Sequence, residues 1–541
     1  MSRRRVVQGV AGAAALIAVF TVLARLAGFG RTLVFTNTVG AGSTGDTYLA
    51  ANNVPNIVFE VVAGGALAAL VVPMLAGGIV TGDREQVRRT ASALLGWTLL
   101  LLTPLAVLVA VLAEPIARLL LGPGDAAQVD LAARFLLVFA PQVVLYGIGI
   151  VLTGVLQAHR RFAGPALAPL LSSVVVAGAY LAFAAIGGSP SADDLSTPAE
   201  LVLSVGTTLG VVALTLSLLV PARRLRLGLR PALRFPVGAA PRVRRLALAG
   251  VLTLAGQQLV AVVAIRLAND GAPDGTQVVY AAGLTVFLVP WAALAVPLAT
   301  SAYPGLAERA GTGDEAGYRR ALAPAATLVV VASLLAAAVL VAVAGPLARV
   351  FLVDWPADTV EALRNTIVAF APGLFGYGLV ALLARALYAR GLWRAPTACV
   401  VGGWLLAVTA DVALALLLPT AHRGAALAAG HSLGVTVAGV ALLAVVLRTV
   451  GRGGLTGVLR TGLPAVGAAA LGAAAGLAVA DALGADPVPH GGLLGAVGTG
   501  VLAAGAALVV AAAVIMGTAR GPLQEAVRGL RSSDRQEVRG G

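Results

Sequence analysis

The stretch FAPQVVLYG, residues 139–147, returns 231 positions later as FAPGLFGYG, residues 370–378. The same offset relates EPIAR at 114–118 to GPLAR at 345–349, and it relates Pro165 to Pro396. One constant offset over several separated landmarks predicts that the chain contains two copies of a single structural unit. Paired copies of a membrane unit are typical of transporters, in which the substrate site lies between the copies.

The composition indicates that these copies lie in a membrane. Of the 541 residues, 59% are hydrophobic and only 11% are charged, and the mean hydropathy is +0.93. The charged residues form short islands between apolar runs of about twenty residues, the length that a helix needs to cross the hydrocarbon core. We count about fourteen such runs, which predicts an all-α integral membrane protein with about 14 transmembrane helices.

The order of these runs predicts the domain organisation. We expect an N-terminal lobe of six spans at 1–220, a basic cytoplasmic linker at 221–245 and a second six-span lobe at 246–448. Two additional spans follow at 449–519, and a cytoplasmic tail occupies 520–541. Because six is even, both copies enter the membrane in the same direction, which makes a parallel repeat. The paired Pro141 and Pro372 predict equivalent bends in equivalent helices.

The distribution of basic residues predicts the orientation. All 38 are arginines, and eight of them lie between Arg223 and Arg245. Under the positive-inside rule, this distribution places both termini in the cytoplasm. The net charge of +14 therefore indicates membrane topology, and we expect no nucleic-acid partner. With no lysine for a Walker-type ATP site and a single cysteine, Cys399, in an apolar run, we expect no cofactor, metal or catalytic residue.

Charged and polar side chains inside the spans are the candidate functional residues. A charge at the centre of a membrane costs at least ~2.5 kcal/mol, so it normally faces a cavity or a partner. Arginine offers a planar fork that suits phosphate or carboxylate oxygens. The candidates for substrate binding are Arg25, Arg31, Asp46, Asn56, Glu60, Arg266 and Arg385.

Several candidates have a structural alternative. Arg31 and Arg266 lie near helix ends, from which a long side chain reaches the interface. Asp46 and Glu60 could be ion-pair partners of the arginines. Asp411, alone in an apolar run, is either a cation or proton site or one side of a hydrogen bond between helices.

Several motifs in a fixed order resemble one known family. They are ARLAGFGR at 24–31, GAG at 40–42 followed by Asp46, VPN at 54–56, QAHRRF at 157–162 and RALYA at 385–389. Together they resemble the MurJ/MviN flippases of the multidrug/oligosaccharidyl-lipid/polysaccharide exporter superfamily, over residues 24 to 447. The two additional helices also fit that family.

The resemblance implies a function. Members of this family turn lipid II, the lipid-linked peptidoglycan precursor, across the bacterial cytoplasmic membrane by alternating access, and they are not enzymes. It implies that Arg25, Arg31, Asp46 and Asn56 lie at the central cavity, with the arginines facing the pyrophosphate. It also implies a lipid-tail groove along the extra helices and coupling to Na⁺ or H⁺, for which Asp411 is our candidate. The implied partners are the lipid-linked precursor, membrane lipids and cell-wall synthesis or division proteins.

Two departures from the family pattern concern the cavity. Phe59 and Gly283 stand where the family usually carries arginines, and we expect Arg266 and Arg385 to compensate. Three alternatives stay open: a flippase for another polyprenyl-linked saccharide, a cation-coupled exporter of small molecules, and a non-transporting scaffold for cell-wall enzymes. Retention of charged residues in the spans argues against the scaffold.

Overall fold

The computed structural model describes residues 23–61, 81–122, 125–234, 240–484 and 492–521, with a few residues between 71 and 79 and between 523 and 528. Every regular element among them is a helix, which confirms the predicted all-α class. The N-terminal residues 1–22 and most of the predicted tail at 520–541 lie outside the described residues.

Ten described helices are long and apolar enough to cross a membrane, and the bent pair α14 (Ala357–Phe370) and α15 (Gly373–Ala389) makes an eleventh. The predicted count of about fourteen is not confirmed. The first predicted span lies largely within residues 1–22, and the second runs into the gap after residue 61. The side chains of α9 (Ala240–Ala268) are described only from Leu254 onward, and that described part is apolar but shorter than a membrane span.

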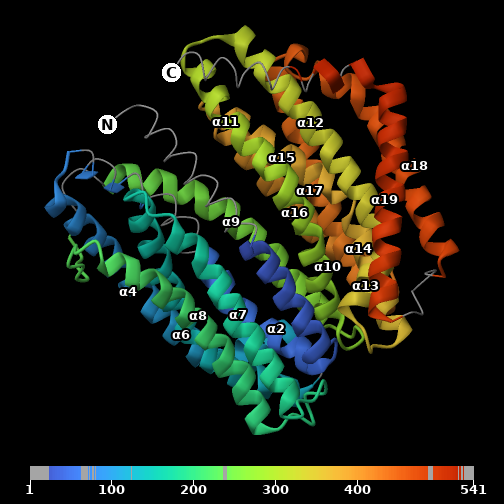
Figure 1. Ribbon diagram of the computed structural model, residues 1–541. Helices are drawn as coiled ribbons and strands as arrows, with labels where there is room; N and C mark the ends of the chain where they lie inside the picture. The colour runs from blue at the N-terminus through green and yellow to red at the C-terminus, as the bar shows by residue number, and fades with distance from the viewer. Residues whose placement is uncertain are drawn as a thin grey trace. The chain divides into compact units, whose positions relative to one another are not determined.

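The chain divides into two compact units, residues 1–278 and 279–541, and the predicted lobe boundaries at 220 and 246 stay a prediction. The first unit begins with a helix at 23–38. Its further helices are α2 (Ser43–Phe59), α4 (Arg84–Val111), α5 (Ala113–Leu121), α6 (Ala126–Ala158), α7 (Ala163–Ala185), α8 (Thr197–Arg223) and α9. The long helix α6 is central because it packs against α2, α4, α5 and α8, while α7 pairs with α8 (Figure 1).

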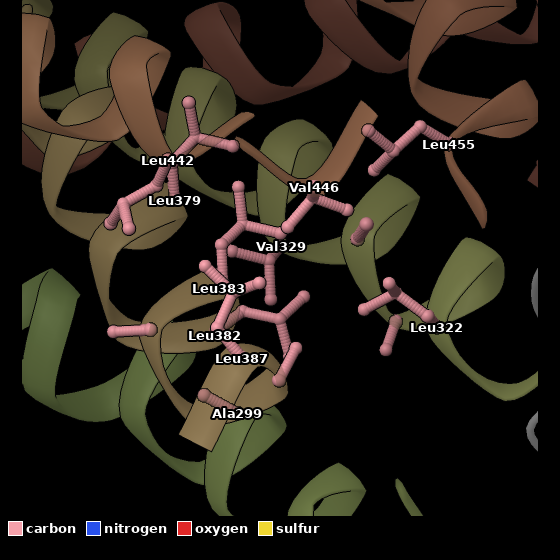
Figure 2. Close-up of a cluster of buried hydrophobic side chains, with 14 of the residues drawn as sticks. Ala299, Leu322, Val329, Leu379, Leu382, Leu383, Leu387, Leu442, Val446 and Leu455 are labelled. Atoms are coloured by element: carbon pink, nitrogen blue, oxygen red, sulfur yellow. The ribbon is translucent and has the colours of Figure 1, made fainter. Parts of the chain in front are cut away.

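The second unit contains most of α10 (Thr276–Pro290) and all later elements. These are a π-helical segment (Trp291–Ala295), α11 (Val296–Gly311), α12 (Glu315–Ala342), α13 (Ala344–Phe351), α14, α15, α16 (Arg394–Leu417), α17 (Arg423–Thr449), α18 (Thr456–Ala482) and α19 (Leu493–Thr518). Leucines of α15, such as Leu382 and Leu383, interdigitate with Val329 of α12 and Val446 of α17 (Figure 2). The last two helices, α18 and α19, pack on each other and on α12.

The helix boundaries repeat at the offset found in the sequence. Helices α4 and α12 begin and end 231 positions apart, and α6 covers the positions equivalent to α14 and α15 together. The start signals are also repeated: Asp83 accepts a hydrogen bond from the amide of Gln86, and Asp314 accepts one from Gly317. Each aspartate caps the first turn of its helix, α4 or α12, where amides lack helical partners.

The helices around the paired prolines differ in continuity, and the prediction of equal bends stays a prediction. α6 continues as one helix through Pro141, whereas α14 and α15 are bent by 40° at Pro372. The second unit has Gly373 after its proline, and a Cβ there would lie 2.8 Å from Ser432 Oγ. Because that space is free, Ser432 approaches and donates to the carbonyls of Ala369 and Phe370 at the break. Such a hydroxyl satisfies acceptors that a kinked helix leaves open.

Candidate functional site

Asp46 lies at the start of α2 and holds the start of α10. Its side chain is buried, and its two carboxylate oxygens accept hydrogen bonds from the backbone amides of Gly275, at 2.7 Å, and Val278, at 2.9 Å. These amides are among those that α10 itself leaves without acceptors, so the carboxylate caps α10 from another helix. The geometry gives Asp46 a structural partner, and its predicted role in substrate binding stays a prediction.

Glycines allow the two helix starts to come this close. Gly275 has a φ of +87°, and a Cβ there would lie 1.9 Å from the carbonyl oxygen of Ala41. A Cβ on Gly45 would lie 2.8 Å from the Val278 side chain. We call this contact between the starts of α2 and α10, formed by Ala41, Gly45, Asp46, Gly275 and Val278, the α2–α10 junction.

The junction borders acidic loops. Burial, together with the nearby charges of Asp125 and Asp193, raises the pKa of Asp274 in the loop before α10. This acid therefore retains its proton to a higher pH than an exposed aspartate does. The three side chains come from connections that lie far apart in the sequence, so the sequence alone did not group them.

Arg25 and Arg31 occupy the helix at 23–38. Arg25 is exposed, whereas Arg31 is half-buried and interacts electrostatically with the hydroxyls of Tyr48, Tyr146 and Tyr180. These tyrosines come from α2, α6 and α7, and the half-buried Arg31 lies within electrostatic range of all three. Its fork of donors is thus available next to a polar cluster rather than in lipid.

That polar cluster was not predicted from the sequence. The hydroxyl of Tyr48 lies 2.7 Å from Thr207 Oγ1 and 2.9 Å from the hydroxyl of Tyr180, and all three side chains are buried. Phe135 and Phe139 surround the Tyr48 ring edge to face. Buried hydroxyls need hydrogen-bond partners, and here they find them across three helices.

Asn56 and Glu60 lie further along the same span. The amide of Asn56 donates to the carbonyl of Asn52, and Glu60 is half-buried in a π-helical turn that follows α2. The neighbouring Phe59 packs against Tyr146, with ring centroids 5.2 Å apart.

The second unit repeats this arrangement. Trp291 begins a π-helical segment and packs against Tyr377, which is 231 positions after Tyr146, at 5.3 Å. Single π-helical turns are rare and are frequently found at functional sites. The two turns lie at equivalent positions of the repeat, and no sequence signal had indicated them.

The two arginines expected to compensate for the missing pair are engaged locally. Arg266 forms an ion pair with Asp270 at 3.1 Å and packs against Gly122 at the end of α5. Arg385 is half-buried in α15 and donates to the carbonyl of Ala381. At Gly283, where an arginine was expected, a Cβ would lie 2.8 Å from the Thr366 side chain, so the backbone of α10 packs directly against α14.

Asp411 is buried in the second unit without a hydrogen-bond partner. Its exposed fraction is 0%, and neither carboxylate oxygen has a donor among the described residues. It faces α17, where a Cβ on Gly430 would lie 2.1 Å from its Oδ1. An ionised carboxylate in such a place is costly unless a cation or a proton neutralises it.

His431 follows Gly430 on α17 and lies in an aromatic cluster. Its Nε2 is 3.2 Å from the hydroxyl of Tyr377, and its ring stacks on that tyrosine and contacts Trp404. The Nδ1 atom has no partner among the described residues. In the described part of the chain, no group of three or more His, Cys, Asp or Glu residues could hold a metal ion.

Comparisons with known proteins place this geometry in a family. The family model of the lipid II flippase MurJ matches residues 35–484. A probable lipid II flippase MurJ from Rhizobium tropici is 27% identical over 420 residues, which cover 75% of this chain and 76% of that protein. The lipid II flippase MurJ of Burkholderia cenocepacia is 25% identical over 427 residues, covering 76% and 79%.

Solved structures show the same fold. A structure of lipid II flippase MurJ in an inward closed conformation superposes with a TM-score of 0.72 at 15% identity, covering 93% of this chain and 99% of that one. An inward-facing multidrug resistance transporter of the MATE family gives a TM-score of 0.63 at 15% identity, with coverage of 80% and 98%. With its many apolar helices, this chain is a multi-pass protein of a bacterial inner membrane, and it belongs to the MurJ family of lipid II flippases.

Proposed function

We propose that this chain translocates lipid II across the cytoplasmic membrane by alternating access, with both termini in the cytoplasm. The observation that carries the proposal is the family match, which extends over residues 35–484. Transport of this kind makes and breaks no covalent bond, so the chain acts as a transporter and not as an enzyme. Its partners are the lipid-linked precursor and membrane lipids, and we add cell-wall synthesis or division proteins as candidates.

Arg31 is the residue that best suits recognition of the pyrophosphate. It is half-buried, it faces tyrosine hydroxyls, and no described acid forms an ion pair with it. A guanidinium with free donors binds phosphate oxygens through two parallel hydrogen bonds. Arg25 provides a second positive charge two turns earlier on the same helix. The exposed apolar faces of α18 and α19, which include Leu463 and Leu494, suit the lipid tail.

Asp411 is our candidate for ion coupling. Its buried carboxylate has no donor among the described residues, so binding of H⁺ or Na⁺ there would remove the cost of an isolated charge. Loading and release would then favour different packings of α16 against α17, which meet at Gly430. Such differential binding is what couples an ion to a conformational change.

Complementation tests the proposal. The chain, an Arg31→Ala variant and an Arg31→Lys variant are expressed in bacteria whose own lipid II flippase is depleted, and lysis and outward exposure of lipid II are measured. We expect rescue by the parent and loss of rescue by Arg31→Ala. Arg31→Lys should be weak because a lysine keeps the charge but lacks the planar fork. An Arg320→Ala variant, which changes an exposed arginine, is the matched control and should rescue.

A different cargo is the second candidate, and the packing at Gly283 favours it. Because α10 lies against Thr366 there, the site has lost an arginine that the family pattern predicts. If a well-expressed and inserted parent fails to rescue, lipid II is not the cargo. Transport assays with other polyprenyl-linked saccharides would then identify it.

A further inference from the structure

The basic linker after α8 is a docked element rather than a free loop. Residues 224–234, which we call the linker strap, run along the first half of α4 beside it (Figure 1). Arg84 donates to the carbonyl of Leu225 at the start of α4. Further along, the indole of Trp97 donates to the carbonyl of Leu233 at 3.0 Å. Both ends of the strap are thus tied to one helix.

The middle of the strap is tied more closely still. The amides of Arg230 and Ala232 donate to the side chain and the carbonyl of Ser92, respectively. A Cβ on Gly96 would lie only 2.0 Å from the carbonyl oxygen of Ala232, so only glycine permits this approach. Leu227 is buried against Val87, Ala91 and Leu94 of α4.

The strap alternates in character, as the sequence RLRLGLR at 224–230 shows. Leu225, Leu227 and Leu229 pack toward the helices, whereas the arginines point outward. The exposed arginines are Arg224, Arg226, Arg230 and Arg234. None of the four forms an ion pair with a residue that the structure describes.

Arg226 lies just after α8 in a backbone conformation that favours glycine. This residue has a φ of +50°, the left-handed region that ends many helices and that glycine occupies most easily. A residue with a Cβ costs roughly 1–2 kcal/mol in that conformation. Arg226 therefore occupies a position where glycine would be less strained, and its exposed side chain forms no ion pair with a described residue.

Under the proposed topology, the strap lies along the cytoplasmic half of α4. The residues of α4 that it contacts extend from Arg84 to Trp97, about 20 Å at 1.5 Å per residue. Trp97, which contacts the strap at Leu233, is 37% exposed, and tryptophan is enriched at membrane interfaces. Under the proposed topology, these arginines face the phosphates of the cytoplasmic leaflet.

We propose that the linker strap is a binding site for the headgroups of anionic phospholipids. The leucines and the bonds to α4 fix the backbone in advance, so binding does not require ordering of the loop. Each basic residue near an anionic membrane surface contributes about a fivefold gain in affinity, from roughly 1 kcal/mol. The site is separate from the pyrophosphate recognition proposed at Arg31, although its assignment to the cytoplasmic leaflet rests on the proposed topology.

Quenching of Trp97 by brominated lipid tests the proposal. The full chain is placed in nanodiscs that contain brominated phosphatidylglycerol or brominated phosphatidylcholine, and a Trp97→Phe variant gives the background to subtract. We expect stronger quenching by the anionic lipid. Replacement of the four strap arginines by glutamine should abolish the difference, and each single replacement should lower the affinity for the anionic lipid about fivefold. A control with Arg320, Arg394, Arg452 and Arg460 changed to glutamine loses the same charge from other exposed positions.

Equal quenching by both lipids in the parent would overturn the proposal, and so would an equal loss in the control. Arg226→Gly gives an independent check if the fourfold variant folds poorly. Glycine adopts the left-handed conformation without strain, so the melting temperature should rise or stay the same. The preference for quenching by the anionic lipid should fall, because one positive charge is lost. An unchanged preference in this stable variant would also overturn the proposal. Because no transport is measured, these outcomes are independent of the complementation result.

Discussion

Replacing Asp46 by asparagine should loosen the start of α10. In the parent, the two carboxylate oxygens each accept one backbone amide, from Gly275 and from Val278. An asparagine has a single acceptor oxygen and places an NH₂ group where the second acceptor was. One amide therefore loses a charge-assisted hydrogen bond in a buried place.

The size of the effect follows from the value of that bond. A hydrogen bond to a charged group contributes about 1.5–3 kcal/mol, and each 1.4 kcal/mol is a factor of ten in an equilibrium. We expect the free energy of local opening at the α2–α10 junction to fall by about 2 kcal/mol in Asp46→Asn. The amides of Gly275 and Val278 should then exchange with deuterium about thirtyfold faster. Asp46→Ala loses both acceptors and should exceed a hundredfold.

Hydrogen–deuterium exchange measured by mass spectrometry on peptides that cover 274–279 gives the assay. The matched control lies in the same chain, because Asp314 caps the amide of Gly317 in the same chemical way. That amide should exchange at the parent rate in both variants. Unchanged exchange at 274–279, or an equal acceleration at Gly317, would refute the capping role of Asp46.

Three further predictions concern stability and coupling. Arg160 has a φ of +57°, and the equivalent residue of the second repeat, Gly391, has a φ of +74°. Arg160→Gly should therefore raise the free energy of unfolding by about 0.5–1 kcal/mol, and Gly391→Arg should lower it. Thermal unfolding in detergent measures both changes. Gly476→Leu should separate α18 from α12, because a Cβ at this position would already lie 2.4 Å from the Cβ of Ala342. The melting temperature should fall by several degrees. An unchanged melting temperature would contradict this packing. Asp411→Asn imitates the neutral carboxyl, so transport by this variant should no longer depend on the ion gradient, while the protein stays folded. A dependence on the ion gradient equal to that of the parent would exclude Asp411 as the coupling site.

The sequence predicted the repeat better than it predicted the contacts. The 231-residue offset reappears in the helix boundaries because caps and breakers such as Gly82-Asp83 and Gly313-Asp314 are local signals, read from a few neighbouring residues. The offset ends after α16, since α17 follows α16 through a shorter connection than the one between α7 and α8. The predicted number of spans stays a prediction, because parts of the first, second and seventh predicted spans lie outside the described residues.

The candidate site shows where local signals are insufficient. The intramembrane charges of Arg31, Asp46 and Asp411 could be identified, but not their surroundings. The contact between Asp46 and Val278 joins residues more than 200 positions apart, and no periodicity reports it. The linker strap was read only as a basic loop, although its alternation of arginine and leucine is the pattern of a segment with one packed face.

The strap also sets the length of the tether between α8 and α9. As a free chain, the residues from 224 to 240 could extend over roughly 55 Å, at 3.3–3.6 Å per residue. With 225–233 bound along α4, only the seven steps from Leu233 to Ala240 remain, and they reach about 24 Å. A movement that carries the start of α9 beyond the reach of this free segment must first detach the strap from α4, which breaks the hydrogen bonds of the strap to Trp97 and Ser92. The docked linker therefore acts as a mechanical stop, and its attachment limits the stroke available during a transport cycle.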